Sequence, residues 1–305
     1  MNTCPPTTLG RTVAFLLQHH SKQLVAALNL DANSARIEVQ CLLQAVLQVN
    51  RAWLLAHPEH SLNDEQYACY MALFERRLIG EPVAYLLGER EFYGLNFKVT
   101  PATLIPRPDT ELIVDLALQR IPQKGRNRVL DLGTGSGAIA LSIAHARPDM
   151  EVVAVDASRE ALEVARENAQ RLGLNNVRLL HSDWFSALHG ERFDIIVSNP
   201  PYIAASDAHL LQGDVRFEPC SALVSGADGL DDIRRITEQA KEHLSVNGWL
   251  LLEHGYDQAA QVRALLQQVG FAAVFSARDL AGIERVSGGS CPTSAGKPDP
   301  GHIRP

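Results

Sequence analysis

Cysteine is scarce in this sequence, and the few residues present show no pairing pattern. The five cysteines are scattered over 305 residues without a Cys-x-x-Cys pair, and the eleven histidines show no ligand spacing. A disulfide framework and a zinc site are therefore disfavoured, and we expect no bound metal. No run of about 18 apolar residues indicates a membrane span, and the N-terminus lacks the basic and apolar stretches of a secretory signal. These absences favour a cytoplasmic protein with no membrane partner.

Positive charge is also in deficit. Lys and Arg total 28 against 35 Asp and Glu, which gives a net charge of −7 and a pI near 5.9. Proteins that bind duplex nucleic acid usually carry a basic surface, because phosphate contacts supply much of their affinity. The charge balance therefore disfavours direct binding to nucleic acid.

The first part of the chain, residues 1–85, predicts a small helical domain. Apolar residues recur there at helical spacing. Asn63 and Gln66 have the spacing of a capping box, which marks the start of a helix. Residues 86–105 then predict a β-hairpin linker, because glycines and aromatic residues are interspersed there.

Residues 106–287 show alternating strand and helix patterns and predict one α/β domain. The expected strands are Arg128–Leu132, Val152–Asp156, Val177–Leu180, Ile195–Ser198 and Trp249–Leu252. The expected helices include Asp109–Leu118, Ala161–Leu172 and Ile233–Leu244. Strands separated by helices imply a parallel sheet with right-handed crossovers. Residues 288–305 are rich in Gly, Pro and Ser and predict a disordered tail.

A glycine-rich turn follows the first strand of this domain. Its residues are Gly133, Thr134, Gly135, Ser136 and Gly137. Glycine permits a positive φ and lets a ligand approach the backbone without a Cβ clash. A turn of this kind at the carboxyl edge of a parallel sheet is typical of nucleotide-like ligand sites. A dinucleotide fold has a similar turn, but its Gly-x-Gly-x-x-Gly pattern places the third glycine later than Gly137.

Acidic residues follow the next two strands. Asp156 lies 19 residues after Gly137, close to the spacing of a carboxylate that accepts hydrogen bonds from ribose hydroxyls. Its alternative role is to cap the helix that follows it. Asp183 could accept from an adenine amine, and Trp184 could pack on the purine face. A loop tryptophan that covers the core fits the same spacing.

The fourth strand runs directly into Asn199-Pro200-Pro201-Tyr202. The prolines fix the backbone and lack N–H groups, which leaves the carbonyls of Asn199 and Pro200 as acceptors beside the Asn199 side chain. These acceptors suit the two donors of a planar NH₂ group, and Tyr202 can pack on its plane. The alternative is a proline turn with a buried tyrosine. We interpret the motif as a clamp that presents a planar nitrogen to a methyl donor.

Methyl transfer to an amide nitrogen needs alignment more than proton abstraction. The nitrogen is a poor nucleophile because its lone pair is delocalised, whereas a sulfonium methyl group is strongly electrophilic. The site must therefore align nitrogen, carbon and sulfur, and its acceptor contacts must strengthen as the nitrogen becomes positive. The extra proton of the methylated nitrogen is very acidic and leaves afterwards, so a general base is not required.

Several motifs in the same order resemble the release factor glutamine methyltransferase family, called PrmC or HemK. The resemblance covers about residues 10–286. Its segments are Arg90–Phe92, Leu104–Glu111, Asp131–Gly137, Ser182–Phe185, Asn199–Tyr202 and Gln212–Pro219. It implies a Rossmann-like class I methyltransferase domain that uses S-adenosylmethionine, with an N-terminal helical domain that docks the substrate. It also implies methylation of the side-chain N5 of the glutamine in the Gly-Gly-Gln motif of class-one peptide chain release factors.

The resemblance also implies roles for individual residues. The donor is expected over Gly133, Thr134, Gly135, Ser136 and Gly137, with Asp156 on the ribose and Asp183 and Trp184 around the adenine. The substrate amide is expected at Asn199, Pro200, Pro201 and Tyr202, with Asn199 also bordering the donor. Arg107, Asp109, Thr110 and Glu218 fall in motifs that line the site. One departure follows Val286, where Ser287-Gly288-Gly289 predicts a shortened last strand.

Four alternatives stay open at this point. A sister family methylates a glutamine of a ribosomal protein and shares the Asn-Pro-Pro-Tyr motif, although Pro108-Asp109-Thr110-Glu111 has the release-factor form. An adenine-N6 DNA methyltransferase uses the same clamp but needs phosphate contacts and base flipping. A protein that only binds S-adenosylmethionine, or a release-factor adaptor without turnover, has no need of the clamp. A Rossmann dehydrogenase is disfavoured by the spacing of the glycines.

Overall fold

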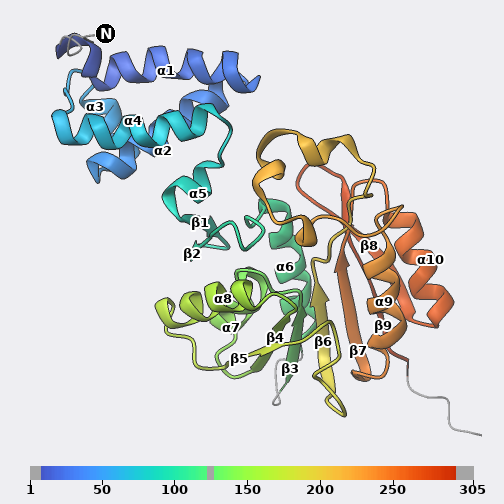
Figure 1. The fold of residues 1–305 in the computed structure, drawn as a ribbon. Coiled ribbons are helices and arrows are strands. Elements are labelled where there is room, and N and C mark those ends of the chain that lie inside the picture. Colours follow the sequence, from blue (N-terminus) through green and yellow to red (C-terminus); the bar gives the residue numbers. More distant parts are fainter. Residues whose placement is uncertain (1–7, 122–126, 293–305) are drawn as a thin grey trace, which may run out of the picture. The chain divides into compact units, whose positions relative to one another are not determined.

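The computed structural model describes residues 8–121 and 127–292, and the chain divides into two units. The first unit contains the residues up to Glu89 together with Leu211–Phe217. The second contains Arg90–Leu210 and the residues from Glu218 onward. Figure 1 shows the helices of the first unit in blue and cyan, and the sheet of the second unit in green to red.

The first unit is helical. It contains α1 (Val13–Leu28), α2 (Ala32–Leu47), α3 (Arg51–Ala56), α4 (Asp64–Leu78) and α5 (Val83–Leu87), after a 3₁₀ turn at Thr8–Arg11. Polar side chains begin these helices: Thr12, Asp31 and Asn50 each accept from backbone N–H groups of the following turn. The predicted capping box of Asn63 and Gln66 is confirmed, with both reciprocal hydrogen bonds present.

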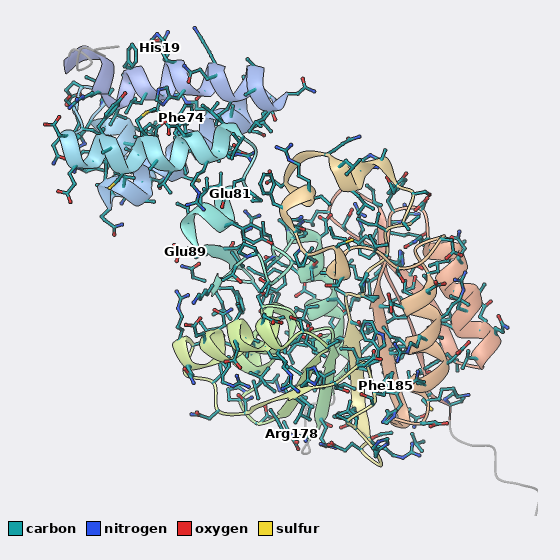
Figure 2. The ribbon with its side chains drawn as sticks, in the orientation of Figure 1. His19, Phe74, Glu81, Glu89, Arg178 and Phe185 are labelled. Atoms are coloured by element: carbon teal, nitrogen blue, oxygen red, sulfur yellow. The ribbon has the colours of Figure 1, made fainter. Side chains whose placement is uncertain are left out.

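The core of the first unit is apolar and aromatic. Phe74, labelled in Figure 2, is buried on α4 and stacks on His20 with ring centroids 4.1 Å apart. Nδ1 of His20 lies 2.8 Å from the hydroxyl of Tyr70. Burial lowers the pKa of His20 to about 4, so its ring is neutral at physiological pH. The ring therefore acts as a packed member of the core.

A segment from far along the chain, Leu211–Phe217, belongs to this helical unit. The buried guanidinium of Arg77 donates to Glu38 at 2.7 Å and to Asp214 at 3.0 Å. It also donates to the carbonyl of Gly80 at 3.0 Å. A buried cation is tolerated only when it is paired and hydrogen-bonded, so these contacts fix the segment to α4. The contacts thus divide the chain differently from a simple boundary at residue 85.

A seven-stranded sheet forms the centre of the second unit, in the order β5-β4-β3-β6-β7-β9-β8. Its strands are β3 (Arg128–Leu132), β4 (Glu151–Asp156), β5 (Val177–His181), β6 (Phe193–Ser198), β7 (Leu244–Glu253), β8 (Ala272–Arg278) and β9 (Glu284–Ser290). Strands β3 to β7 are parallel, and β9 is antiparallel to both neighbours. The predicted α/β fold is confirmed. The chain runs from β3 outward to β5 and then returns to β6 on the other side of β3, so the strand order reverses between β3 and β6. Sheets of this kind bind ligands at the carboxyl ends of the strands on either side of this reversal.

Helices cover both faces of this sheet (Figure 1). They are α6 (Glu111–Arg120), α7 (Ala138–Ala146), α8 (Arg159–Arg171), α9 (Asp231–Ala240) and α10 (Ala259–Val269). Alternate strand residues point to opposite faces. Val129 accordingly belongs to a buried cluster with residues of α6 and α7, whereas Leu130 belongs to one with residues of α9 and α10. The central strands are mostly apolar because both of their faces are buried.

The chain also contains shorter elements. A two-stranded hairpin pairs β1 (Glu89–Phe92) with β2 (Leu95–Lys98). A 3₁₀ turn at Pro108–Thr110 leads into α6, and further 3₁₀ turns lie at Ala208–Leu211, Gly213–Phe217 and Cys220–Ala222. Within residues 8–121 and 127–292, no helix has the length and apolar character needed to cross a membrane.

The end of the sheet differs from expectation. The prediction of a tail that begins at residue 288 was wrong, because Gly288 and Gly289 lie inside β9 and are buried. A Cβ on Gly288 would lie 2.6 Å from the carbonyl oxygen of Leu250, and one on Gly289 would lie 2.8 Å from Cβ of Phe271. Glycine here permits close approach of neighbouring chain, a role that composition alone misread as disorder. The rest of the predicted tail, residues 293–305, lies outside the described residues.

One further boundary was wrong, and one strand was not predicted. The helix predicted to reach Leu244 ends at Ala240, and Leu244 instead begins β7. The pattern also gave no indication of β8, whose residues are mostly half-exposed at the sheet edge. An edge strand has one partly solvated face and therefore a weak hydrophobic signature.

Candidate active site

A cavity of about 290 Å³ lies at the carboxyl ends of β3, β4 and β6. Most of the predicted site residues line it: Gly133, Thr134, Gly135, Ser136, Asp156, Asp183, Trp184, Asn199 and Pro201. Gly137, Pro200 and Tyr202 are not among the residues that line it. Because Leu132 of β3 pairs with Ser198 of β6, the glycine turn and the Asn-Pro-Pro-Tyr segment leave adjacent strands at the same level.

The glycine turn is shaped by backbone hydrogen bonds. The N–H groups of Gly133 and Thr134 both donate to the carbonyl of Val155 at 2.9 Å. Gly133, Gly135 and Gly137 have φ values of +71°, +56° and +86°, which disfavour residues with a Cβ. A Cβ on Gly137 would also lie 2.8 Å from Cδ1 of Leu141 in α7. Gly137 thus serves the packing of α7 rather than the cavity wall.

Asp131 supports this turn from below, although its own role was not predicted. Its carboxylate is fully buried and accepts from the hydroxyl of Thr134 at 2.6 Å and from the N–H of Ala140 at 3.2 Å. Burial raises the pKa of Asp131 to about 7. The side chain therefore ties the end of β3 to both the turn and the first turn of α7.

Asp156 holds the neighbouring part of the cavity wall. One carboxylate oxygen accepts from the N–H of Gly135 and the other from the N–H of Ser158, both at 2.8 Å. Burial is the largest influence on Asp156 and raises its pKa. Ser158 is the residue that caps α8, through a hydrogen bond from Ala161. Asp156 therefore combines contact with the cavity and support of the turn that leads into α8.

Asp183 and Trp184 are held by a helix that sequence reasoning did not connect with the site. Both oxygens of the Asp183 carboxylate accept from the guanidinium of Arg235 on α9, at 2.9 and 2.6 Å. The indole Nε1 of Trp184 donates to Asp232 on the same helix at 3.3 Å. A Cβ on Gly133 would lie 3.4 Å from the Trp184 ring, so the indole stands directly over the turn. The only signal in the sequence is the spacing of Asp232 and Arg235 on one helix face.

The Asn-Pro-Pro-Tyr segment forms the opposite wall. The side-chain nitrogen of Asn199 donates to the hydroxyl of Thr110 at 3.3 Å. The carbonyl of Tyr202 accepts from the side chain of Gln258 at 3.0 Å, which anchors the end of the segment. Burial raises the pKa of Tyr202 further above its usual range, so its hydroxyl is neutral. Asn199 and Pro201 therefore face the cavity, whereas Tyr202 belongs to the wall behind them.

Residues Ala102–Thr110 complete the wall. Arg107 lines the cavity and donates to the buried carboxylate of Glu218 at 2.6 Å. Thr110 is buried and also borders the cavity. Asp109 does not border it and lies 3.6 Å from the guanidinium of Arg285. Glu253, at the end of β7, is a buried acid close to Thr110 and Asn199 that the sequence motifs did not reveal.

The fold and this cavity are those of a class I methyltransferase, and residues 112–214 match the family model described as Methyltransferase small domain. Residues 16–88 match the model described as PrmC N-terminal domain. A release factor glutamine methyltransferase of Bordetella pertussis is 53% identical over 267 residues, which cover 87% of this chain and 98% of that protein. The protein of the same name from Escherichia coli K12 is 48% identical over 270 residues, covering 88% of this chain and 97% of that protein. The chain belongs to the release factor glutamine methyltransferase family.

A solved structure supports the fold independently. A methyltransferase from Pyrococcus furiosus superimposes with a TM-score of 0.51 at 21% identity, over 72% of this chain and 98% of that one. At this identity the likeness concerns the fold alone. It shows that the doubly wound sheet with helices on both faces recurs in that protein.

Proposed function

We propose that this chain transfers a methyl group from S-adenosylmethionine to the side-chain N5 of a glutamine, the one in the Gly-Gly-Gln motif of class-one peptide chain release factors. One observation carries the proposal: Asn199 and the glycine turn open onto the same cavity. A donor held at the turn and an amide held at Asn199 then share one space. Family membership favours the release factor as the substrate.

The wall formed by the glycine turn fits S-adenosylmethionine. Nothing lies within 4 Å of the position of a Cβ on Gly135, so a ligand can approach the backbone there. Asp156 would hold the ribose hydroxyls, and Trp184 with Asp183 would border the adenine. The bound donor supplies an electrophilic methyl group on its sulfonium. The protein's task on this side is to orient the donor so that this methyl group points toward Asn199.

The opposite wall fits a planar amide. Oδ1 of Asn199 would accept from the substrate nitrogen, and this contact strengthens as the nitrogen becomes positive. The carbonyl of Pro200, which the sequence predicted as a second acceptor, is not part of the cavity lining. Three carboxylates border the described cavity, namely those of Asp156, Asp183 and Asp232. Asp156 accepts from the turn, while Asp183 and Asp232 contact Arg235 and Trp184. All three thus serve the donor side, which agrees with loss of the proton after transfer rather than before it.

The helical unit would contribute recognition of the protein substrate. Its match to the PrmC N-terminal domain and the fixed segment Leu211–Phe217 support a docking role rather than a catalytic one. We place the reaction in the cytoplasm, where release factors act, and without a direct role for nucleic acid.

A substrate panel tests this proposal. The purified protein is incubated with S-adenosylmethionine and, separately, a class-one release factor, a ribosomal protein fraction and adenine-containing duplex DNA. Mass spectrometry then measures added methyl groups. Methylation of the release factor at the Gly-Gly-Gln glutamine is the expected result. Transfer only to a ribosomal protein or to DNA would assign a different substrate, and donor binding without any transfer would indicate a non-enzymatic binding protein.

A further inference from the structure

Glu253 is a buried acid next to two residues that line the cavity, Thr110 and Asn199, and the mechanism above does not use it. It is the last residue of β7, whose preceding residue, Leu252, pairs with Ser198 directly before Asn199. Only 2% of its surface is exposed. Within residues 8–121 and 127–292, its Oε2 atom has no hydrogen-bond partner. Burial of a carboxylate without a full set of partners costs stability, so its presence here points to a task.

The contacts of Glu253 point to Asn199. The nearby side chains of Thr110 and Asn199 lower the pKa of the Glu253 carboxyl, against a larger opposing effect of burial. Asn199 Nδ2 also donates to the hydroxyl oxygen of Thr110 at 3.3 Å. Because the Thr110 oxygen accepts from Asn199, its single hydroxyl proton is left to point toward the neighbouring Glu253 carboxyl. The NH₂ group of Asn199 thus has the Thr110 oxygen as its acceptor, with the Glu253 carboxyl nearby.

The orientation of an asparagine amide is decided by such partners. The two ends of the amide have nearly the same shape, so only hydrogen bonding distinguishes them. With the acceptors Thr110 and Glu253 on one side of the amide, the Asn199 nitrogen points toward them. Oδ1 then points away from them and is left for the substrate. A reversed amide would present N–H donors to the N–H donors of the substrate. That arrangement removes one acceptor contact from the transition state and replaces it with repulsion.

We propose that Glu253 and Thr110 are positioning residues that lock the Asn199 amide with its oxygen toward the substrate nitrogen. This inference rests on the proposed function, since it assigns a role at the same site. Charged and titratable groups around Glu253 are Arg285 on β9, Asp109 in the turn before α6, and Tyr202 after β6. None of these offers the amide a comparable acceptor, because Asp109 contacts Arg285 and Tyr202 retains its proton.

Two matched pairs of variants test the lock through turnover of release factor. Glu253→Met removes the acceptor, whereas Glu253→Gln keeps one acceptor oxygen in nearly the same shape. Thr110→Val removes the hydroxyl, whereas Thr110→Ser keeps it. We expect kcat to fall roughly tenfold or more in the Met and Val variants, and by less than about threefold in the Gln and Ser variants. Affinity for S-adenosylmethionine, measured by calorimetry, is expected to stay within about twofold in all four.

Control measurements separate a positioning role from a purely structural one. Ser287→Ala cuts a buried hydrogen bond to His254, the next residue after Glu253, at 2.8 Å, and is expected to leave turnover unchanged. Near-normal kcat in Glu253→Met would overturn the inference. Equal impairment of the Gln and Met variants would also overturn it, because a retained acceptor must rescue the lock. If the wild-type protein methylates no release factor, the proposed function fails and the positioning role fails with it. If the wild-type protein is active and Glu253→Met is unimpaired, only the positioning role is contradicted.

Discussion

The two sides of the cavity are built in different ways. On the side of β3 and β4, backbone N–H groups of Gly133, Thr134 and Gly135 make the shaping contacts. On the side of β6 and β7, side chains of Asn199, Thr110 and Glu253 make them. The glycines of the turn stand together in a short stretch of sequence, whereas Asn199, Thr110 and Glu253 come from three distant segments. The glycine turn is therefore recognisable from local sequence, whereas the acceptor side, like the support of Asp183 and Trp184 by α9, depends on tertiary contacts.

The largest expected effect is on the acceptor side. Asn199→Ala removes an oxygen that the account uses mainly in the transition state, so kcat should fall by about 10²–10³ with donor affinity nearly unchanged. Steady-state kinetics with release factor, together with calorimetry of S-adenosylmethionine, measure the two quantities. A near-normal kcat of Asn199→Ala would contradict the assignment of Asn199 to the acceptor side of the cavity.

Glu253→Gln should raise stability at neutral and higher pH. Burial raises the pKa of Glu253 from 4.5 to about 7 in the folded state. The folded protein therefore holds the proton more tightly, and the stability contributed by this group is lost as pH rises from about 4.5 through about 7. The neutral glutamine avoids this loss, on the order of 3 kcal/mol at pH 8 and little at pH 4.5.

Urea unfolding of both proteins at the two pH values measures this gain. Asp131, whose pKa is also raised to about 7, is present in both proteins and cancels in the difference. A gain that does not depend on pH, or a loss of stability at pH 8, would show that Glu253 is not a desolvated acid retained at a cost.

On the donor side, Asp156→Ala should act on affinity before it acts on kcat. The change removes the acceptor for the N–H groups of Gly135 and Ser158 as well as the proposed ribose contact. We expect S-adenosylmethionine to bind roughly tenfold more weakly or worse, with a smaller change in kcat at saturating donor. Calorimetry measures the affinity. Unchanged affinity would contradict the ribose assignment and leave Asp156 with only its backbone role.

The smallest effect is expected from Arg235→Ala. The ion pair between Arg235 and Asp183 is exposed, and such pairs contribute only about 0.2–1 kcal/mol. Donor affinity should therefore change by less than about fivefold. A loss of donor affinity far beyond fivefold would indicate that Arg235 itself contacts the donor. The adenine pocket would then be formed by α9 as well as by Asp183 and Trp184.

The same contrast explains what the sequence could predict. Strands β3 to β6, the glycine turn and Asp156 were predictable because period, glycines and spacing are local signals. Asp232, Arg235 and Glu253 were not, because their importance arises from contacts between distant segments. Gly288 and Gly289 misled the prediction for a related reason: only the packing of Leu250 and Phe271 against them shows why glycine is required.

The most direct test of the account follows the methyl group itself. Release factor is incubated with the wild-type protein and S-adenosylmethionine carrying an isotopically labelled methyl group, and tandem mass spectrometry locates the label. We predict the label on the side-chain nitrogen of the Gly-Gly-Gln glutamine, with almost none after incubation with Asn199→Ala. Label on another residue, or equal labelling by the two proteins, would contradict it.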